Sequence, residues 1–303
     1  MSVFDSIGDT IERLDATGYL IDRDAATIAY LAARMEKPLL VEGPAGVGKT
    51  ELARAMSTAL GRELIRLQCY EGLDEAKALY EWEYAKQLLY TQILRDKIGE
   101  TVGDAASLHE AVERIATQDD VFFSERFLQP RPLLRAILSD NPVVLLIDEI
   151  DKADAEFEAF LLEVLSDFAV TVPELGTMQA HTQPIVVLTS NAAREMSDAL
   201  RRRCLHLHLD FPDEERERAI IRRRVPDASE ALARQVASVV ARLRKLGLRK
   251  QPSIAESIDW ARALLLLNAE RLDPEVVSST LSLVLKYEGD VRKGRENLAA
   301  LLN

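Results

Sequence analysis

Cysteine and aromatic residues are scarce in this chain of 303 residues, and positive charges are fewer than negative ones. The two cysteines, Cys69 and Cys204, belong to no C-x-x-C or Cys/His cluster, which predicts buried thiols in a reducing compartment rather than a zinc or redox site. Lysine and arginine total 38 against 50 acidic residues, and the net charge of −12 argues against a general nucleic-acid binder. Because no apolar run approaches transmembrane length and the N-terminus lacks a signal-peptide pattern, we expect a cytoplasmic protein.

Hydrophobic residues make up 48% of the chain, and Leu, Ala, Arg and Glu dominate, a composition typical of a helix-rich globular α/β protein. Apolar segments of strand length alternate with helical patterns, which predicts a five-stranded parallel sheet with helices on both faces. The predicted strands are 38–43, 64–70, 142–148, 185–191 and 206–211. A long helical and irregular insert, about 72–140, separates the second strand from the third.

The pattern changes at Pro212, after which only helical periodicity is found. We therefore expect two domains, an α/β domain over 1–211 and an all-helical domain over 212–303. The length of the chain is sufficient for both.

The stretch GPAGVGKT (43–50) matches G-x-x-x-x-G-K-[ST] and lies between a predicted strand and a predicted helix. Such a P-loop turns backbone N–H groups toward phosphate oxygens and adds the dipole of the following helix. Lys49 is expected to contact the β- and γ-phosphates, and the Thr50 hydroxyl is expected to bind Mg²⁺. The predicted nucleotide contacts are Gly43, Pro44, Ala45, Gly46, Val47, Gly48, Lys49, Thr50 and Glu51.

A second acidic motif, VVLLIDEID (143–151), ends a strand whose composition predicts burial on both faces. In a P-loop fold we expect this strand to lie beside the P-loop strand. Asp148 would then help to hold Mg²⁺, usually through water, and Glu149 would polarise a water aimed at the γ-phosphorus. Asp151 has two interpretations, a helix N-terminus or a salt bridge to an arginine, including one from a neighbouring chain.

Two further polar features follow the last buried strands. Asn191 ends the strand IVVLTSN and is predicted to orient the attacking water, the alternative being an Asn that starts a turn. Three consecutive arginines, Arg201 to Arg203, precede the fifth strand. Such a run is usually a solvated face, but at the sheet edge one of them could reach the γ-phosphate of an adjacent subunit as an arginine finger.

Taken together, these motifs resemble those of AAA+ ATPases. The stretches 69–89, 131–137, 145–177 and 188–204 are similar to the MoxR branch, and within it to the CoxD-type ATPases associated with carbon monoxide dehydrogenase and related molybdenum hydroxylases. The resemblance implies ring hexamers with ATP between subunits. It also implies a chaperone that matures or activates a metalloenzyme, often with a von Willebrand factor A domain partner. CoxD-type members are implicated in completing the metal–sulfur centre of the hydroxylase.

The resemblance also implies residue roles. It makes Lys49 and Thr50 the Walker A pair, Asp148 and Glu149 the Walker B pair, and Asn191 sensor 1. The arginine finger falls on Arg202 or Arg203. The stretch 170–184 becomes a hairpin that faces the pore of the ring, although a plain structural turn is an equal alternative. The adenine pocket would be formed by Tyr19, Leu20 and Ile21, with ordinary core packing as the alternative.

One departure from the family pattern concerns the sensor 2 arginine at the start of a lid helix. The corresponding stretch, QPSIAESIDWARALL (251–265), has Ala255 at that place, which puts γ-phosphate sensing by the lid in doubt. Arg262 lies seven residues further on, on the same helix face but about 10 Å along the axis at about 1.5 Å per residue. We expect it to serve the lid surface or an adjacent subunit rather than the phosphate.

Two other functions fit the same fold. One is a DNA-directed AAA+ motor or loader, which the charge of −12 disfavours and a strongly salt-dependent DNA affinity would favour. The other is a nucleotide-gated scaffold with little turnover, against which the presence of Glu149 argues. We favour an ATP-hydrolysing chaperone that remodels a partner protein.

Overall fold

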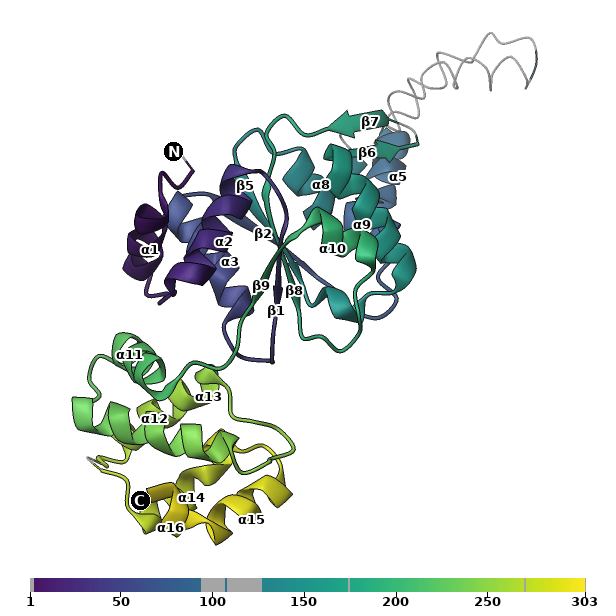
Figure 1. Cartoon of the computed structure of the whole chain (residues 1–303). Coiled ribbons are helices and arrows are strands. Elements are labelled where there is room, and N and C mark those ends of the chain that lie inside the picture. The colour runs from purple at the N-terminus through teal and green to yellow at the C-terminus, as the bar shows by residue number, and fades with distance from the viewer. Residues whose placement is uncertain (1–2, 94–106, 108–126, 174, 270, 303) are drawn as a thin grey trace.

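The computed structural model describes residues 3–93, 107, 127–173, 175–269 and 271–302. An α/β unit contains all strands of the described chain, and a group of helices from α11 onward lies beside it (Figure 1). Within the described residues, no helix is both long and apolar enough to cross a lipid bilayer.

A five-stranded sheet in the order β2-β5-β8-β1-β9 forms the centre of the α/β unit, and all of its strand pairs are parallel. This confirms the predicted sheet. Every residue of β5 and β8 is buried, because helices cover both faces of the sheet. The strands are β1 (Leu39–Glu42), β2 (Glu63–Gln68), β5 (Val143–Asp148), β8 (Ile185–Ser190) and β9 (Leu205–His208).

The predicted strand neighbours were wrong in one respect. The strand that carries the acidic motif, β5, does not lie beside the P-loop strand β1, because β8 is inserted between them and pairs with both. Three strands of equally apolar composition fit the middle of a parallel sheet equally well, so composition does not fix their order. The inserted strand brings its own C-terminal end, at Ser190, between the two motifs.

The sheet separates two hydrophobic cores, one between each of its faces and the helices that cover that face. One face is covered by the N-terminal helices and packs Leu39, Val41 and Leu146, while the other packs Leu40 and Leu145, as alternation along a strand requires. The first group contains α1 (Ile7–Ala16), α2 (Arg23–Arg34) and α3 (Lys49–Leu60). The second contains α8 (Pro132–Ile137), α9 (Ala155–Asp167) and α10 (Asp198–Arg203), with the 3₁₀ turn η3 (Ile150–Lys152) after β5.

The predicted insert, about 72–140, lies largely outside the described residues. Its described parts contain two short strands that the sequence did not indicate, β3 (Tyr80–Trp82) and β4 (Leu128–Pro130), which pair in an antiparallel arrangement. The described helices of this stretch are α4 (Glu75–Leu79), α5 (Tyr84–Ile93) and α8. Further along, β6 (Ala169–Val172) and β7 (Gly176–Gln179) form the hairpin expected over 170–184.

After β9 the described chain contains helices and no strand. These helices enclose a core of their own that includes Trp260, Leu264 and Val277. A buried ion pair between Glu217 and Arg244, with oxygen–nitrogen distances of 2.5 and 2.8 Å, joins the first two helices. The helices are α11 (Glu214–Arg224), α12 (Glu230–Arg244), α13 (Ile254–Leu266), α14 (Pro274–Val284), α15 (Glu288–Glu296) and α16 (Leu298–Leu302).

Candidate active site

The loop 43–50 runs from the end of β1 to the start of α3, and two of its glycines leave no room for a side chain. Gly43 and Gly46 have φ angles of 149° and 80°, which L-residues rarely adopt. A Cβ atom on Gly43 would lie 2.0 Å from the carbonyl oxygen of Leu209, and one on Gly46 would lie 2.2 Å from Cβ of Ser253. The loop is therefore in direct contact with the segment after β9 and with the start of α13.

Lys49, the first residue of α3, is 6% exposed and extends along this loop. Its Nζ donates to the carbonyl oxygens of Gly43 at 2.7 Å and Pro44 at 2.8 Å, and to Oδ1 of Asn191 at 2.8 Å. Burial lowers the pKa of Lys49, and the nearby carboxylate of Asp151 opposes that change. The ammonium is thus held where a P-loop lysine meets phosphate oxygens.

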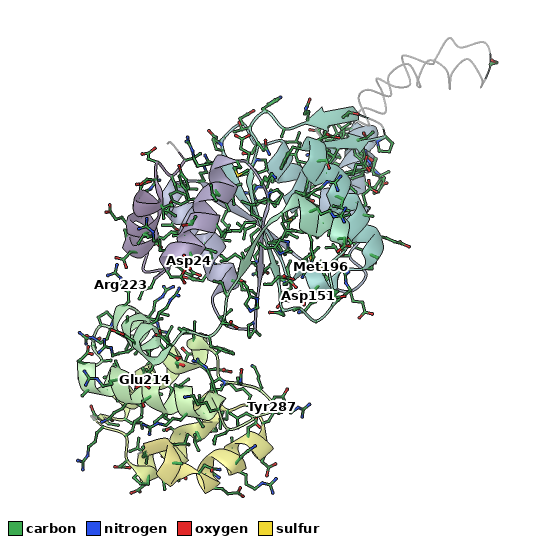
Figure 2. All side chains as sticks on the ribbon, viewed as in Figure 1. Asp24, Asp151, Met196, Glu214, Arg223 and Tyr287 are labelled. Carbon is green, nitrogen blue, oxygen red and sulfur yellow. The ribbon has the colours of Figure 1, made fainter. Side chains whose placement is uncertain are left out.

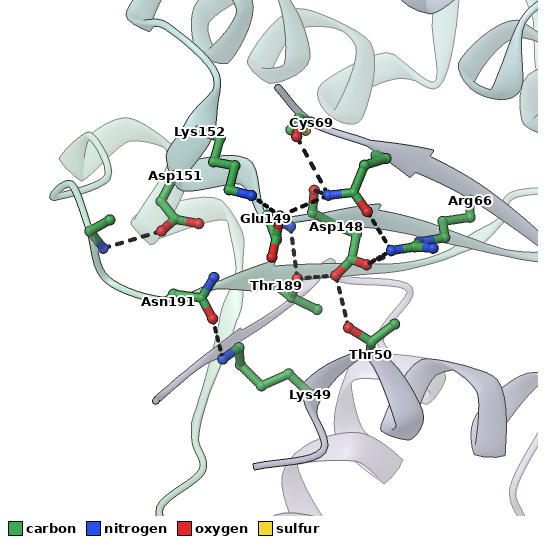
Figure 3. Close-up of polar contacts among 12 residues, drawn as sticks. Lys49, Thr50, Arg66, Cys69, Asp148, Glu149, Asp151, Lys152, Thr189 and Asn191 are labelled. Carbon is green, nitrogen blue, oxygen red and sulfur yellow. Dashed lines mark hydrogen bonds and ion pairs between the residues drawn. The ribbon is translucent and has the colours of Figure 1, made fainter. Parts of the chain in front are cut away.

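Asp148, the last residue of β5, is 2% exposed and has hydrogen bonds to both carboxylate oxygens. Oδ1 accepts from the hydroxyls of Thr50 at 3.0 Å and Thr189 at 2.6 Å. Oδ2 accepts from Nε of Arg66 at 3.0 Å and from its Nη2 at 2.5 Å (Figure 3). Because the Thr50 hydroxyl donates its proton to Asp148, its oxygen lone pairs stay available for a metal ion.

Glu149 follows with a left-handed backbone, φ 58° and ψ 50°, which is uncommon for a residue with a side chain. Its N–H donates to Oγ1 of Thr189 at 2.9 Å, so Thr189 connects the backbone of Glu149 with the carboxylate of Asp148. Its Oε2 accepts from Nε2 of Gln68 at 2.9 Å and pairs with Nζ of Lys152 at 2.5 Å (Figure 3). The carboxylate is therefore fixed by two donors, and its side chain remains 32% exposed.

Asn191 and Asp151 lie on the side of Glu149 that is away from Arg66 (Figure 3). Asn191 comes directly after β8 and contacts Lys49 through its amide oxygen, so the structure joins the predicted sensor to the P-loop. Asp151 is 7% exposed, and its Oδ2 accepts from the N–H of Ala193 at 3.1 Å. Its Oδ1 is buried and has no hydrogen-bond partner among the residues described.

The three arginines of α10 differ in their contacts. Arg201 forms an ion pair with Glu42 at the end of β1, with both oxygens 2.9 Å from Nη2. Nε of Arg203 donates to Oγ of Ser166 at 2.9 Å. Arg202 is exposed, and its side chain forms no hydrogen bond or ion pair with the described part of the chain. Of the two predicted candidates, Arg202 is thus the one whose guanidinium is unengaged.

A cavity of about 770 Å³ lies where the loop, the strand ends and the helical unit meet. That volume is typical of small-molecule sites. Two of the predicted nucleotide contacts, Gly43 and Pro44, are not on its wall, and neither is Arg202 or Arg203. The predicted residues that do line it are Tyr19, Leu20, Ala45, Gly46, Val47, Gly48, Lys49, Thr50, Glu51, Asp148, Glu149 and Asn191.

The predicted adenine segment is only partly in the cavity. Tyr19 and Leu20 line it, and the ring of Tyr19 lies 3.6 Å from the position that a Cβ on Gly48 would take. Burial raises the pKa of Tyr19 far above its usual value, so its hydroxyl stays protonated. Ile21 does not line the cavity and packs against the core under the N-terminal helices, which Tyr19 also contacts. For Ile21, core packing is the observed outcome.

The helical unit supplies the opposite wall of the cavity. The N–H of Ile254, the first residue of α13, donates to the carbonyl oxygen of Gly46 at 3.2 Å, so the helix rests on the loop. Ala255 and Arg262 both line the cavity, as their spacing on one helix face predicts. Arg262 is 57% exposed and pairs with Asp259 at 3.4 Å. We still predict that Arg262 does not contact the phosphate.

The donors present fit a nucleoside triphosphate with Mg²⁺. The loop has the close-packed glycine backbone that a phosphate cradle needs, and Lys49 lies in it with its charge. Thr50 and Asp148 would hold the metal, which commonly takes one or two protein ligands and completes its shell with phosphates and water. In the described chain no cluster of three or more His, Cys, Asp or Glu side chains offers a metal site independent of phosphates.

Sequence reasoning missed the polar residues that hold these acids in place. Arg66 and Gln68 alternate along the edge strand β2, and the parallel register sets Gln68 opposite Asp148. A polar residue at every second position of the otherwise apolar LIRLQ was a usable signal, since such residues share one face. Thr189, inside a buried strand, gave no such signal.

Comparisons with known proteins agree with this site. Residues 38–204 match the family model described as AAA domain (dynein-related subfamily). The chain is 25% identical to Protein NorQ of Paracoccus denitrificans over 210 residues, which cover 69% of this chain and 66% of NorQ. It is 25% identical to the gas vesicle ATPase GvpN2 of Halobacterium salinarum over 281 residues, 87% of this chain and 72% of GvpN2. The chain thus spans slightly less than two thirds of the length of NorQ.

Among solved structures, a mutant of RuvB from Thermotoga maritima matches 92% of this chain and 72% of its own chain. The TM-score is 0.50 and the sequence identity is 20%. At that identity the match shows a shared fold and nothing about function.

Proposed function

Because the chain belongs to the AAA domain family, dynein-related subfamily, we propose that it is a Mg²⁺-dependent ATPase that hydrolyses ATP to remodel a partner protein. One observation carries the proposal. Lys49 at the start of α3, Asp148 and Glu149 at the end of β5, and Asn191 after β8 line the same cavity, and a hydrogen bond joins Lys49 to Asn191.

Each of these side chains then has a role in hydrolysis. Lys49 binds the β- and γ-phosphates, while Thr50 and Asp148 hold Mg²⁺, which screens phosphate charge when bound. Glu149 accepts the proton of the attacking water, and Asn191 orients that water. Both contacts of the Glu149 carboxylate, from Gln68 and Lys152, are to Oε2, so Oε1 is the oxygen that would accept the proton.

A complete site requires a second copy of the chain. Arg202 is exposed, has no partner in the described chain and is absent from the cavity wall, so it is available to the site of a neighbour. Arg203 is held by Ser166, which makes it the weaker candidate. We propose a ring, a hexamer by family resemblance, in which Arg202 acts as the arginine finger.

The division into domains 1–211 and 212–303 belongs to the same proposal. Three ion pairs connect α11 with the α/β unit: Arg216 with Asp22, Arg223 with Asp15, and Arg224 with Glu51. Arg223 lies on the side of α11 that faces the α/β unit (Figure 2). Side chains in these pairs are between 31% and 51% exposed, and such pairs exchange readily with water. This supports a helical lid that opens and closes over the nucleotide.

For the client, we propose a metalloenzyme of the molybdenum hydroxylase type, assisted by a von Willebrand factor A domain protein. The support for this client is the resemblance to CoxD-type MoxR ATPases, and the similarity to NorQ and GvpN2 supports only the MoxR-like branch. The hairpin β6–β7 would face the pore of the ring and meet the client there.

Capture of the client tests the proposal. The Glu149→Gln variant, which should bind ATP without hydrolysing it, is used as bait with ATP, and Lys49→Ala is the matched control that cannot bind ATP. A metalloenzyme retained by the first and not by the second supports the proposal. Retention by both would mean that capture does not depend on ATP and would contradict the proposal. Recovery of nucleic acid with an affinity that falls steeply with salt would favour the DNA-directed motor instead.

A nucleotide-gated scaffold is the remaining alternative. It predicts ATP binding with no multiple turnover in the wild type at any protein concentration. Single-turnover and steady-state phosphate release, measured on the same sample, separate the two functions. Sustained release that depends on Glu149 excludes the scaffold.

A further inference from the structure

Arg66 contacts an acid of the site and has no part in the hydrolysis proposed above. It lies in the edge strand β2, and its side chain is 43% exposed, yet its guanidinium reaches the buried Asp148. Nε and Nη2 both donate to Oδ2 of Asp148, at 3.0 and 2.5 Å. Nη2 also contacts Oε1 of Gln68, the next residue on the same face of β2. This charge-assisted contact on Oδ2, together with the two hydroxyls on Oδ1, fixes the orientation of the carboxylate.

The contact divides the two oxygens of Asp148 between different partners. Oδ1 faces the hydroxyl of Thr50, the proposed metal ligand, whereas Oδ2 is taken by Arg66. Asp148 therefore meets the metal side of the cavity with one oxygen that already accepts two hydroxyl protons. Arg66 therefore brings a full positive charge to the same carboxylate whose other oxygen would serve Mg²⁺.

Both effects disfavour a free cation. Like charges repel strongly at such short range in a partly buried site, and Asp148 is neutralised by Arg66 before a metal arrives. A cation that comes with a triphosphate has phosphate oxygens as ligands, so it depends less on Asp148.

From this geometry we propose that Arg66 is a positioning residue that makes metal binding depend on nucleotide. It holds Asp148 in a neutral pair and so prevents Mg²⁺ from loading the nucleotide-free loop. The inference rests on the proposed assignment of Asp148 to the metal site. Arg66 touches neither the reacting atoms nor the metal, and it acts only through Asp148.

The test measures binding of Mn²⁺, used as a paramagnetic probe, to the nucleotide-free full chain. In Arg66→Met, which keeps most of the side-chain length without the charge, Asp148 loses its partner on Oδ2 while still lining the cavity. We expect the dissociation constant of Mn²⁺ to fall by about tenfold or more, the scale expected when one neighbouring unit charge is removed. With ATP present, the difference between variant and wild type should shrink.

Three further variants make the result specific. Arg66→Met combined with Asp148→Asn should return to the weak binding of the wild type. Arg135→Met, which removes an arginine from an exposed pair with Glu63 away from the cavity, should change nothing. Arg66→Lys keeps the charge, so its Mn²⁺ binding should stay as weak as that of the wild type. This variant still tests the proposal if Arg66→Met does not fold.

Unchanged Mn²⁺ affinity in a folded Arg66→Met would overturn the proposal, as would tight binding in Arg66→Lys or in the double variant. Thermal unfolding of each variant shows whether it is folded. Phosphate release by the wild type is measured separately. If the wild type shows no turnover but Arg66→Met shows the expected shift in Mn²⁺ affinity, only the proposed function is contradicted. If the wild type shows turnover and Arg66→Met shows no shift, only the role of Arg66 is contradicted.

Discussion

The two walls of the cavity are built in different ways. On the sheet side, Lys49 and Asp148 are at most 6% exposed and have several hydrogen bonds each, at distances from 2.5 to 3.0 Å. On the helical side, Arg216 and Arg224 are about one third exposed and pair with one carboxylate each, and Arg216 also donates to the carbonyl oxygen of Leu20 at 3.0 Å. The phosphate end is therefore preorganised, whereas the lid end is held by contacts that solvent and salt weaken.

The largest effect is expected from the sheet wall. Lys49→Ala removes the buried cation that contacts Gly43, Pro44 and Asn191, and with it the charge paired with the β- and γ-phosphates. ATP–Mg²⁺ binding, followed by titration calorimetry, should be abolished. Wild-type affinity in this variant would show that the loop is not the phosphate site.

The next largest effect concerns a side chain outside both walls. Arg202→Ala should slow hydrolysis in the assembled state by a factor on the order of a thousand or more, since an arginine finger stabilises the charge of the transition state. Arg203→Ala, the matched control on the same helix turn, should have a much smaller effect because Arg203 is tied to Ser166. Equal losses, or the reverse order, would contradict the assignment.

Mixing extends this prediction. A ring that contains both Arg202→Ala and Glu149→Gln subunits includes some sites with an intact glutamate and an intact neighbouring arginine. Such mixtures should regain part of the activity. No recovery in demonstrated mixed rings would mean that Arg202 does not act across the interface.

The lid wall should respond moderately. Replacing both Arg216 and Arg224 by Gln removes two exposed pairs worth about 0.2–1 kcal/mol each, so nucleotide release should accelerate by about two- to thirtyfold. The control is Arg218→Gln with Arg234→Gln, which breaks pairs to Glu230 inside the helical unit. Stopped-flow release of a fluorescent ATP analogue at low and high salt is the measurement. In the wild type, release should speed up with salt, and an equal rate for variant and control would show that these pairs do not hold the lid.

The smallest effect is expected at Arg262. Its side chain lines the cavity but is mostly exposed and is paired only with Asp259. Arg262→Ala should leave ATP affinity within a few-fold of the wild type, measured by titration at fixed Mg²⁺. A loss near that of Lys49→Ala would show that Arg262 serves the phosphate in place of the missing sensor 2 arginine.

The contrast between the walls also explains what the sequence predicted. Lys49, Thr50, Asp148 and Glu149 were predicted from local spacing around strand ends and Asn191 from its place after a buried strand; the structure brings all five to one cavity, and their roles stay predictions. The order of β5, β8 and β1 was missed, since strand pairing is a long-range choice among similar apolar segments.

Partners of these residues were harder to predict. The contact between Arg66 and Asp148 joins residues 82 positions apart, and it depends on the register of β2 against β5. In the same way, the packing of Ile21 against the core under the N-terminal helices depends on tertiary contacts and not on its neighbours in sequence. The distinction between Arg202 and Arg203 required the position of Ser166 on another helix.

The most direct test of an ATP-hydrolysing site is the Glu149→Gln variant, with ATP binding and phosphate release measured on the same samples. The amide keeps the size of the side chain but cannot accept the proton of water, so ATP–Mg²⁺ affinity should match the wild type while steady-state release falls by about 10²–10⁴-fold. A steady-state rate equal to that of the wild type would contradict the account, because another group would then have to activate the water.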